Sequence, residues 1–386
     1  MKIKLFNKIA ERGICRFGEG YEVGENVVGA EGIMVRSASL HDLEPWKELL
    51  AVARAGAGVN NIPVDKFKEK GIVVFNTPGA NANAVKELCI SALLLSSRNI
   101  VSGIEWVRNL TPSEQGIAKD VEKGKAAFAG CEILGKTLGV VGLGAIGGLV
   151  ANSARALGMN VIGFDPFLTV NAAWNLSGAI KRAENYDQIY AESDYITLHL
   201  PLNDSTKGMI NKNVISQMKR GVKLINLSRA ELVSDEALEE ALQSGQISCY
   251  VTDFPTEKIR SLPNTICIPH LGASTVESED NCAVMASDCL KEYLETGNVT
   301  NSVNYPPVSI PKTNKPRVCV CHHNVANMIA RITAAISSRN INIENMANGS
   351  KGDYAYTIIE IDLLPSDAVL ADILSIEGVV KVRLVK

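Results

Sequence analysis

A glycine-rich stretch near the middle of the chain restricts the fold more than any other feature. Gly142, Gly144 and Gly147 follow a strand-like run at 138–141 and lead into a helical run at 146–157, which contains the third glycine. The first glycine permits a tight turn, the second lets the backbone approach a phosphate group, and the third allows close helix packing. Free N–H groups at the start of the helix face the same phosphates. The pattern predicts a dinucleotide-binding α/β unit. The alternative is a glycine-rich turn that binds no nucleotide.

Short β-branched runs alternate with helical stretches on both sides of this motif, which predicts parallel sheets with crossover helices. Before the motif, strands are expected at 3–6, 32–35, 50–53 and 72–75, followed by a helix at 84–98. After it, strands are expected at 160–164, 195–199, 223–227, 248–251 and 265–268, followed by a helix at 283–296. The fold class is therefore α/β, with two Rossmann-like, doubly wound parallel-sheet domains.

The C-terminal part of the chain has a different pattern. Residues 304–312 contain three prolines and predict a linker. Beyond it, strands are expected at 317–321, within 341–347, at 354–361 and at 379–385, with helices at 326–338 and 367–375. This βαββαβ order is typical of a small ferredoxin-like domain.

Composition excludes several classes of protein. The 386 residues include 46% hydrophobic and 21% charged residues, which fits a soluble multidomain chain. The net charge of −3 offers no basic surface for nucleic acid. No apolar run approaches the roughly 20 residues of a membrane helix, and no signal peptide is recognised at the N-terminus. We expect a cytoplasmic protein without a nucleic-acid or membrane partner.

The nine cysteines contain no Cys-x-x-Cys pair and predict reduced, mostly buried thiols. Cys319, Cys321, His322 and His323 could suggest a metal site. Alternation along a strand, however, would point both cysteines to one face, which suits packing equally well. We therefore expect no metal.

Asp165 ends the strand after the glycine motif, 18 residues beyond Gly147. A carboxylate at this place can accept hydrogen bonds from the adenosine ribose hydroxyls. It would repel a 2′-phosphate, and no arginine follows to neutralise one. The predicted cofactor is NAD.

Three polar residues follow predicted strands and are candidates for oxidation of a hydroxy acid. That reaction needs a cation for the carboxylate and carbonyl, and an acid/base for the hydroxyl proton. His270 is the best acid/base candidate, Arg229 the best cation, and Glu257 could support the histidine. On spacing alone, Arg229 and Glu257 could equally be a surface pair. His199 also ends a strand, where a structural role is the simpler interpretation, and His41 fits a solvated loop.

Four motifs follow one another along the chain. They are the glycine motif at 142–147, Asn-Leu-Ser-Arg at 226–229, Phe-Pro-Thr-Glu at 254–257 and Pro-His-Leu-Gly-Ala-Ser-Thr at 269–275. In this order they resemble the D-isomer-specific 2-hydroxyacid dehydrogenases. The resemblance implies that Arg229 binds the substrate carboxylate, His270 takes the hydroxyl proton and Glu257 stabilises the imidazolium. It also implies a set of cofactor-binding residues, namely Gly142, Gly144, Ala145, Ile146, Gly147, Asp165, His199, Pro201, Thr206, Asp253 and Gly272.

Arg36-Ser37 and the segments 54–62 and 76–81 are similar to the phosphoglycerate dehydrogenase branch of that family. This implies NAD-dependent oxidation of 3-phospho-D-glycerate, the first step of phosphorylated serine biosynthesis. The implied substrate residues are Arg36, Ser37, Arg54, Gly56, Asn81, Arg229 and His270. The family pattern also implies a substrate domain at 1–98 and 278–305, an NAD domain at 99–277, a linker at 306–316 and a regulatory domain at 317–386.

The last domain resembles an ACT domain, an amino-acid-binding module that commonly pairs between subunits. His322, Asn324 and Asn342 match the positions that bind serine in serine-inhibited members. Asn327 departs from the family's proline-glycine turn, so serine regulation and a purely structural pairing domain both stay open. The expected assembly is a homodimer or homotetramer.

Other departures concern loops. Ala230, Asp253 and Lys258 differ from the family pattern, and the interval from Arg229 to Glu257 is short. Two alternative functions remain: a hydroxypyruvate or glyoxylate type of 2-hydroxyacid dehydrogenase, and an NAD-sensing binding protein without useful turnover.

Overall fold

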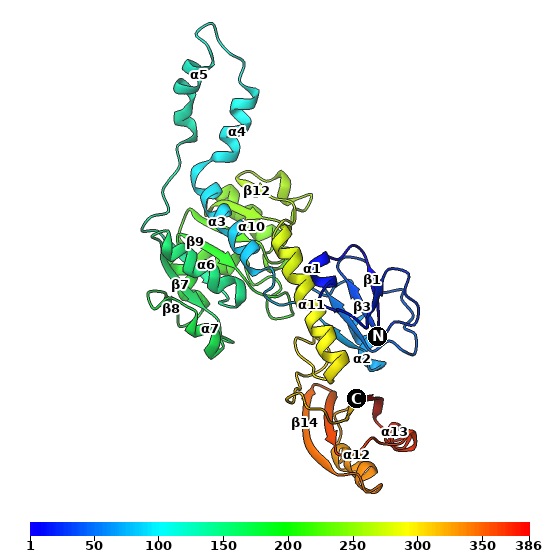
Figure 1. The fold of residues 1–386 in the computed structure, drawn as a ribbon. Helices are drawn as coiled ribbons and strands as arrows, with labels where there is room; N and C mark the ends of the chain where they lie inside the picture. Colours follow the sequence, from blue (N-terminus) through cyan, green and yellow to red (C-terminus); the bar gives the residue numbers. More distant parts are fainter. The chain divides into compact units, whose positions relative to one another are not determined.

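The computed structural model describes residues 1–386 and divides into two compact units, unit 1 (Met1–Asn81 with Val276–Lys386) and unit 2 (Ala82–Thr275) (Figure 1). The family pattern implied boundaries near 98 and 278. The difference comes from helix α3 (Ala82–Arg98), whose Cys89, Ala92 and Leu93 are buried in a core cluster of unit 2. This helix therefore belongs to the inserted unit.

A seven-stranded parallel sheet forms the centre of unit 2, with the strand order β12-β11-β10-β9-β6-β7-β8. Its strands are β6 (Thr137–Val141), β7 (Asn160–Phe164), β8 (Lys181–Arg182), β9 (Tyr195–Leu198), β10 (Val222–Asn226), β11 (Ile247–Thr252) and β12 (Thr265–Cys267). Its helical segments are α6 (Ala145–Ala156), α7 (Val170–Trp174), α8 (Tyr186–Glu192), α9 (Lys212–Gln217), η2 (Ala230–Leu232), α10 (Asp235–Ser244) and η3 (Ile259–Ser261). The predicted Rossmann-like sheet is confirmed. The two-residue strand β8 has no periodicity that a sequence pattern could detect.

Apolar clusters cover both faces of this sheet. One cluster contains Leu198, Leu224 and Leu238, and another contains Val140 and Ile225. Strands buried on both faces are continuous apolar runs, which made them predictable from sequence.

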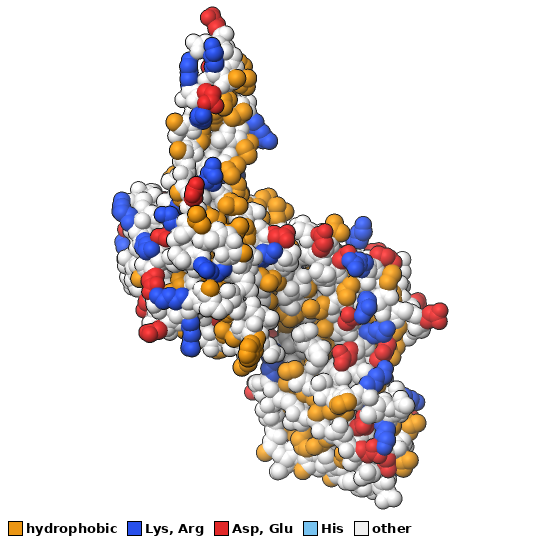
Figure 2. All heavy atoms as spheres, turned by 60° about the vertical axis from the view of Figure 1, so that its left-hand side comes forward, with side chains coloured by type: hydrophobic (Ala, Val, Ile, Leu, Met, Phe, Trp, Pro, Cys, Tyr) orange, Lys and Arg blue, Asp and Glu red, His pale blue; other side chains and the backbone are white.

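A helical arm, which the sequence pattern does not predict, leaves unit 2 after α3. It consists of α4 (Ile100–Asn109), α5 (Ile117–Gly124) and the 3-10 turn η1 (Lys125–Phe128) (Figure 1). None of the residues in these three elements is buried. Apolar side chains gather along the arm (Figure 2), and Ile104 and Val107 are among those exposed. The arm therefore carries an apolar surface that the rest of unit 2 does not cover.

Unit 1 contains a five-stranded parallel sheet with the strand order β2-β1-β3-β4-β5. Its elements are β1 (Lys2–Phe6), α1 (Glu11–Ile14), β2 (Glu22–Gly24), β3 (Gly32–Val35), β4 (Ala51–Arg54), α2 (Val64–Glu69), β5 (Val73–Phe75) and the returning helix α11 (Val276–Thr296). Leu290 and Tyr293 of α11 share a buried cluster with Ile3, Met34 and Phe75. The long helix thus completes the first sheet domain.

The C-terminal domain is a four-stranded antiparallel sheet with the strand order β14-β15-β13-β16. Its elements are β13 (Arg317–His323), α12 (Met328–Ser337), β14 (Ile343–Lys351), β15 (Tyr354–Ile361), α13 (Asp367–Leu374) and β16 (Val379–Val385). Both helices contribute to one buried cluster, with Ile332 and Ile373 fully enclosed. The predicted βαββαβ arrangement is confirmed.

The proline-containing segment before this domain is packed rather than extended into solvent. Val299 and Val308 exchange two backbone hydrogen bonds of 2.8 and 3.0 Å, and Ile310 is buried. One apolar cluster spans the first sheet, α11 and the C-terminal domain, and it includes Phe75, Tyr293, Cys319 and Tyr356. The C-terminal domain therefore shares a core with the rest of unit 1.

A buried ion pair strengthens the same junction. The Nη2 atom of Arg317 lies 3.1 Å from Oε2 of Glu360, and the two side chains are only 3% and 6% exposed. Arg317 also donates to the carbonyl oxygens of Thr296 (3.0 Å) and Pro311. Its guanidinium thus ties β13 to the end of α11 and to the connecting segment.

No single helix of the chain has both the length and the apolar character needed to cross a membrane. Helices α3 and α4, bent by 65° at their junction, meet that criterion together by length and composition only.

Candidate active site

The glycine motif forms the turn from β6 into α6. Gly142 has a positive φ of 90°, a conformation that residues with a Cβ rarely adopt. A Cβ on Gly147 would collide with the carbonyl oxygen of Gly142, whereas no atom lies within 4 Å of the Cβ position of Gly144. Ala145 and Ile146 begin α6, so their N–H groups belong to the free first turn of the helix. The loop leaves open space in front of a helix N-terminus, as a bound pyrophosphate requires.

Asp165 lies beside this loop, just after β7. Its Oδ2 accepts a 2.9 Å hydrogen bond from Leu143 N–H, and its Oδ1 accepts one of 2.9 Å from Phe167 N–H. The carboxylate is therefore fixed next to the glycine turn. The structure brings the two parts of the predicted nucleotide site together.

His199 follows β9, next to the glycine turn. Its Nε2 lies 3.0 Å from Thr197 Oγ1, while its buried Nδ1 has no hydrogen-bond partner. Burial lowers the pKa of His199 to about 4, so the ring is neutral at physiological pH. Farther along, Thr206 Oγ1 donates a 2.7 Å hydrogen bond to the carbonyl oxygen of Pro201. The neutral ring leaves one buried nitrogen without a partner, which a bound cofactor could provide.

Arg229 and His270 both lie close to the aromatic ring of Phe254. The ring centroids of Phe254 and His270 are 4.5 Å apart. The Cζ atom of Arg229 lies 5.8 Å from the centroid of the Phe254 ring. Arg229 Nη1 donates to Ser228 O at 2.6 Å. These residues follow the neighbouring strands β10, β11 and β12, whose carboxyl ends lie at one edge. Phe254 was detectable only as part of the family motif.

The structure gives Glu257 an ion pair with Arg260 and no hydrogen bond or ion pair with His270. Its side chain is 90% exposed and pairs with Arg260, three residues later, at 3.1 Å. The reason is local: Thr256 Oγ1 accepts the N–H of Ile259 at 3.1 Å, so the short loop turns directly into η3. The glutamate therefore faces its own turn.

Asp253 is the carboxylate that the structure places near His270. It is 1% exposed, and its Oδ1 has no hydrogen-bond partner. Burial raises the pKa of Asp253. The charge of His270, a hydrogen bond from the N–H of Gly272 and the charge of Arg229 lower it by a smaller amount. A carboxylate and two basic side chains thus gather at this edge of unit 2.

The expected substrate residues of unit 1 also follow the ends of parallel strands. Arg36 and Ser37 come after β3, Arg54 ends β4, and Asn81 comes soon after β5. Arg54 Nε donates to Arg36 O at 3.1 Å, and a Cβ on Gly56 would collide with the Arg54 guanidinium. The side-chain oxygen of Asn81 is buried and has no hydrogen-bond partner.

One partner of this group was not anticipated. Glu279, in the first turn of α11, forms a 2.7 Å ion pair with Arg36 Nη2. Both side chains are about 40% exposed. The charge of Arg36 is therefore partly neutralised within unit 1.

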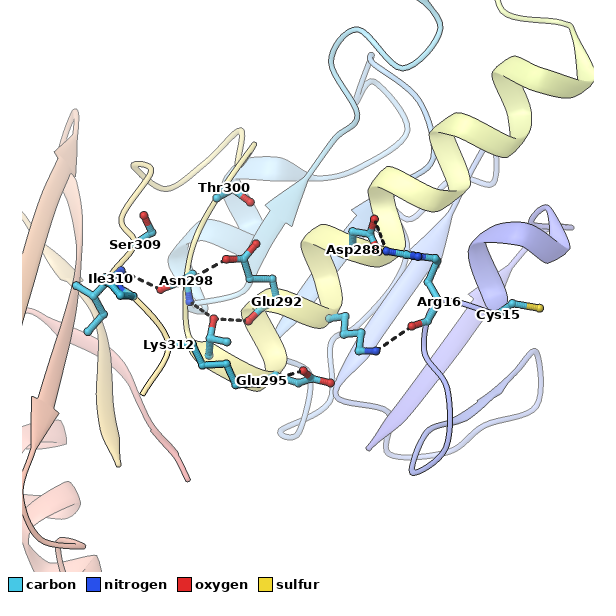
Figure 3. Close-up of a pocket in the computed structure, with 13 residues that line it drawn as sticks. Cys15, Arg16, Asp288, Glu292, Glu295, Asn298, Thr300, Ser309, Ile310 and Lys312 are labelled. Atoms are coloured by element: carbon cyan, nitrogen blue, oxygen red, sulfur yellow. Dashed lines mark hydrogen bonds and ion pairs between the residues drawn. The ribbon is translucent and has the colours of Figure 1, made fainter. Parts of the chain in front are cut away.

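Unit 1 also contains a groove of about 840 Å³ between α1, the end of α11 and residues 298–312 (Figure 3). None of the predicted site residues lines it. Arg16 pairs with Asp288 at 2.7 Å, Lys291 donates to the backbone oxygen of Arg16, and Lys312 approaches Glu295 at 3.8 Å. With its charges satisfying one another, the groove offers no distinct anion or cation site.

The three expected effector residues lie at opposite ends of the C-terminal sheet. His322 pairs with Ala355 near the end of β13, and Asn324 follows in the next turn, with its N–H donating to Asp353 O. Asn342 precedes β14, whose first residue pairs with Ile361 at the other end of β15. Within one chain, the structure does not bring Asn342 to the other two. Asn327 adopts the left-handed conformation, with φ 63°.

Comparison with known proteins supports the family assignment. Residues 91–272 match the profile of the D-isomer specific 2-hydroxyacid dehydrogenase NAD-binding domain. A hydroxypyruvate reductase of Thermotoga maritima is 38% identical over 259 residues, which cover 64% of this chain and 79% of that protein. A D-3-phosphoglycerate dehydrogenase of Methanocaldococcus jannaschii is 31% identical over 349 residues, covering 88% of this chain and 64% of that protein.

A D-3-phosphoglycerate dehydrogenase of Bacillus subtilis is 33% identical over 328 residues, which cover 81% of this chain and 59% of that protein. The chain thus spans about 60% of the length of each of these two phosphoglycerate dehydrogenases. A crystal structure of an NAD+-bound 3-phosphoglycerate dehydrogenase of Entamoeba histolytica has a TM-score of 0.61 at 26% identity, covering 78% of this chain and 98% of that one. This chain belongs to the D-isomer specific 2-hydroxyacid dehydrogenase family.

Proposed function

We propose that the chain is an NAD-dependent D-3-phosphoglycerate dehydrogenase that forms 3-phosphohydroxypyruvate, the first step of phosphorylated serine biosynthesis. The observation that carries this proposal is that Arg229 and His270 both lie close to the ring of Phe254, in the unit that holds an intact glycine turn. The phosphoglycerate dehydrogenase relatives of four further species, at 32–36% identity, support the substrate assignment. Retention of both basic residues argues against a cofactor sensor without turnover.

The residues around the glycine turn fit NAD. The open space at Gly144 accommodates a pyrophosphate, and the unpartnered Nδ1 of His199 offers a further contact. Asp165 suits a ribose with free hydroxyls and repels a 2′-phosphate. When bound, NAD supplies the acceptor for the hydrogen that leaves the substrate carbon with its electron pair.

The protein side chains have separate tasks in the reaction. Arg229, held through Nη1 by Ser228 O, keeps further N–H groups for the substrate carboxylate and carbonyl oxygen. His270 takes the hydroxyl proton on a ring nitrogen during oxidation and returns it during reduction. Phe254 packs against both groups and limits their movement.

Arg36, Arg54 and Asn81 form the proposed site for the substrate phosphate. Two arginines suit a phosphate because guanidinium groups donate several charge-assisted hydrogen bonds. The alternative is an unphosphorylated substrate such as hydroxypyruvate. It is favoured by the Thermotoga maritima relative and by Glu279, which already neutralises part of Arg36.

The C-terminal domain is, in this proposal, an ACT-type domain that binds serine. Since Asn342 lies at the opposite end of the sheet from His322 and Asn324, a site that uses all three needs two copies of the domain. A homodimer, or a tetramer that pairs these domains as well, accounts for that requirement. The uncovered arm, with an apolar hollow of about 460 Å³, gives unit 2 a second surface for a like chain. We place this assembly in the cytoplasm.

The direct test follows NADH absorbance with purified protein, NAD and 3-phosphoglycerate at alkaline pH, with and without millimolar serine. NADH formation supports the activity, and its loss with serine supports the effector site. His270→Ala should lower turnover by about 10²-fold or more while NADH binding is retained. No NADH from 3-phosphoglycerate, but oxidation of NADH by hydroxypyruvate, would transfer the assignment to the alternative substrate.

A further inference from the structure

We infer that Cys131 is a modification site, a thiolate beside Lys223 and Tyr195 that hydroperoxides oxidise to a sulfenic acid. The site belongs to unit 2 but not to the proposed active site. Tyr195 begins β9 and Lys223 lies near the start of β10, so the cluster occupies the amino ends of the strands. Arg229 and His270 follow the carboxyl ends. The inference therefore stands independently of the proposed function.

Three neighbouring strands and the foot of the helical arm form the cluster. Lys223 is in register with Tyr195 on one side and with Cys249 on the other, so these three side chains share one face of the sheet as a row. Cys131 follows the arm, and its N–H donates to the carbonyl oxygen of Ser97, near the end of α3, at 2.9 Å. The Ser97 hydroxyl lies 2.8 Å from the Tyr195 hydroxyl. The backbone of Cys131 is thereby fixed beside the row.

The sulfur of Cys131 has two polar neighbours that suit a negative charge. Lys223 Nζ donates to Sγ at 3.7 Å, and the Tyr195 hydroxyl lies 3.4 Å from Sγ. The ammonium of Lys223 lies 5.0 Å from the centroid of the Tyr195 ring and forms no ion pair with a carboxylate. A cation whose hydrogen-bond acceptor is a sulfur favours the ionised form of that sulfur. Lys223 therefore has the thiolate of Cys131 as its counterion.

The balance of burial and charge at Cys131 agrees with this geometry. Burial opposes ionisation of the thiol. The hydrogen bond with Tyr195 and the positive charge of Lys223 outweigh burial, so the pKa of Cys131 lies below its ordinary value. Lys136, in the segment before β6, adds a smaller effect of the same sign. At physiological pH more of this sulfur is therefore in the nucleophilic form than in a free cysteine.

The other cysteines of the chain lack this combination of exposure and charge. Six of the nine are buried, among them Cys249 of the same row, whose pKa burial raises to about 11. Burial also raises the pKa of Cys267. Cys15 is exposed, but its Sγ lies 3.7 Å from a carboxylate oxygen of Glu11, which disfavours a thiolate. Cys131 is therefore the thiol that is both partly exposed and held in the ionised form.

The reaction consumes one hydroperoxide. The Cys131 thiolate attacks a peroxide oxygen, so that an S–O bond forms while the O–O bond breaks. Sulfur loses two electrons, and the hydroperoxide is reduced to an alcohol, or to water where the oxidant is hydrogen peroxide. The departing oxygen takes a proton from the ammonium of Lys223, which regains one from water. A dithiol returns the sulfenic acid to the thiol and releases water.

The first test measures the ionisation of each cysteine in the full-length protein. Only the thiolate reacts with iodoacetamide, so the pH midpoint of the alkylation rate, followed by peptide mass spectrometry, reports that ionisation. The midpoint of Cys131 should lie below that of Cys15. Lys223→Met should raise the Cys131 midpoint by about one pH unit and slow its alkylation at pH 7 by roughly fivefold or more. Lys223→Arg, which keeps the charge, should retain the low midpoint. Lys212→Met is the matched control, because it removes a lysine that pairs with Glu240 at 2.8 Å.

The second test treats the protein with hydrogen peroxide and traps sulfenic acid with dimedone. The adduct should form at Cys131 before it forms at Cys15, and dithiothreitol added before dimedone should prevent it. An adduct that forms first at Cys15, or none at Cys131, would overturn the inference. An unmoved Cys131 midpoint in Lys223→Met would do the same. Should that variant not fold, the wild-type protein decides, because a Cys131 midpoint at or above that of Cys15 contradicts a stabilised thiolate.

Discussion

The neutral histidine beside the glycine turn should make unit 2 less stable as pH falls. His199 has a pKa near 4 in the folded protein and near 6.5 when unfolded, so the unfolded chain binds the proton more readily. This penalty is absent above pH 6.5, grows between 6.5 and 4, and is complete below 4. At about 1.4 kcal/mol per pH unit, the free energy of unfolding should fall by up to about 2 kcal/mol between pH 7 and pH 5.

The measurement is urea unfolding at pH 7 and pH 5, followed by circular dichroism, for wild type and His199→Gln. The glutamine cannot gain a proton, so the loss of unfolding free energy between the two pH values should be smaller in the variant by up to the same amount. His41→Gln, at an exposed position, is the control. Equal losses in wild type and His199→Gln would refute the conclusion that burial keeps this ring neutral.

Three further predictions follow from contacts described above. Gly147→Ala should weaken NADH binding by roughly tenfold or more, measured by fluorescence titration, because the new Cβ collides with backbone of the glycine turn. Glu360→Gln should lower the free energy of unfolding by about 3 kcal/mol in urea, because it leaves the buried Arg317 without its counterion. Glu279→Gln should raise kcat/KM for 3-phosphoglycerate relative to unphosphorylated D-glycerate by roughly threefold to tenfold, because it frees Arg36 for a phosphate.

Each of these variants has a matched control in the chain. Gly148→Ala places its Cβ at ordinary contact distances and should bind NADH normally. Glu344→Gln removes a partly exposed ion pair with Lys315 and should cost less than about 1 kcal/mol. Asp280→Asn changes a carboxylate of the same helix that pairs with Arg12 instead of Arg36. A variant that matches its control would contradict the corresponding explanation.

Most of the strands were predictable because they are apolar runs buried on both faces of a sheet. The expected strands 32–35, 160–164 and 354–361 coincide with β3, β7 and β15. The arm from α4 to η1 was not predicted, although its helices are amphipathic, and none of its residues is buried in a domain core. Three prolines predicted a linker before the C-terminal domain, but they say nothing about burial, and Val308 and Ile310 are enclosed.

The site was predictable as far as chain order determines it. Arg229 and His270 could be assigned to one edge because parallel strands end together. The direction of a loop side chain is not encoded in that order. Glu257 turns to Arg260 because Thr256 closes a short turn, whereas Asp253 is fixed by the end of β11. Antiparallel register likewise separates Asn342 from His322, although both belong to one small domain.

Helix α11 gives unit 1 a mechanical property. Its 21 residues form a rod about 32 Å long, with Glu279 holding Arg36 at its first turn. At its last turns, Arg383 of β16 packs on the ring of Tyr293 at 4.3 Å, and Tyr356 of β15 donates to Gly297 O at 2.7 Å. An α-helix is stiff along its axis, so the two ends of α11 move together. Any rearrangement of the C-terminal sheet that tilts or slides this helix is therefore delivered, as motion, to the arginine at the opposite end.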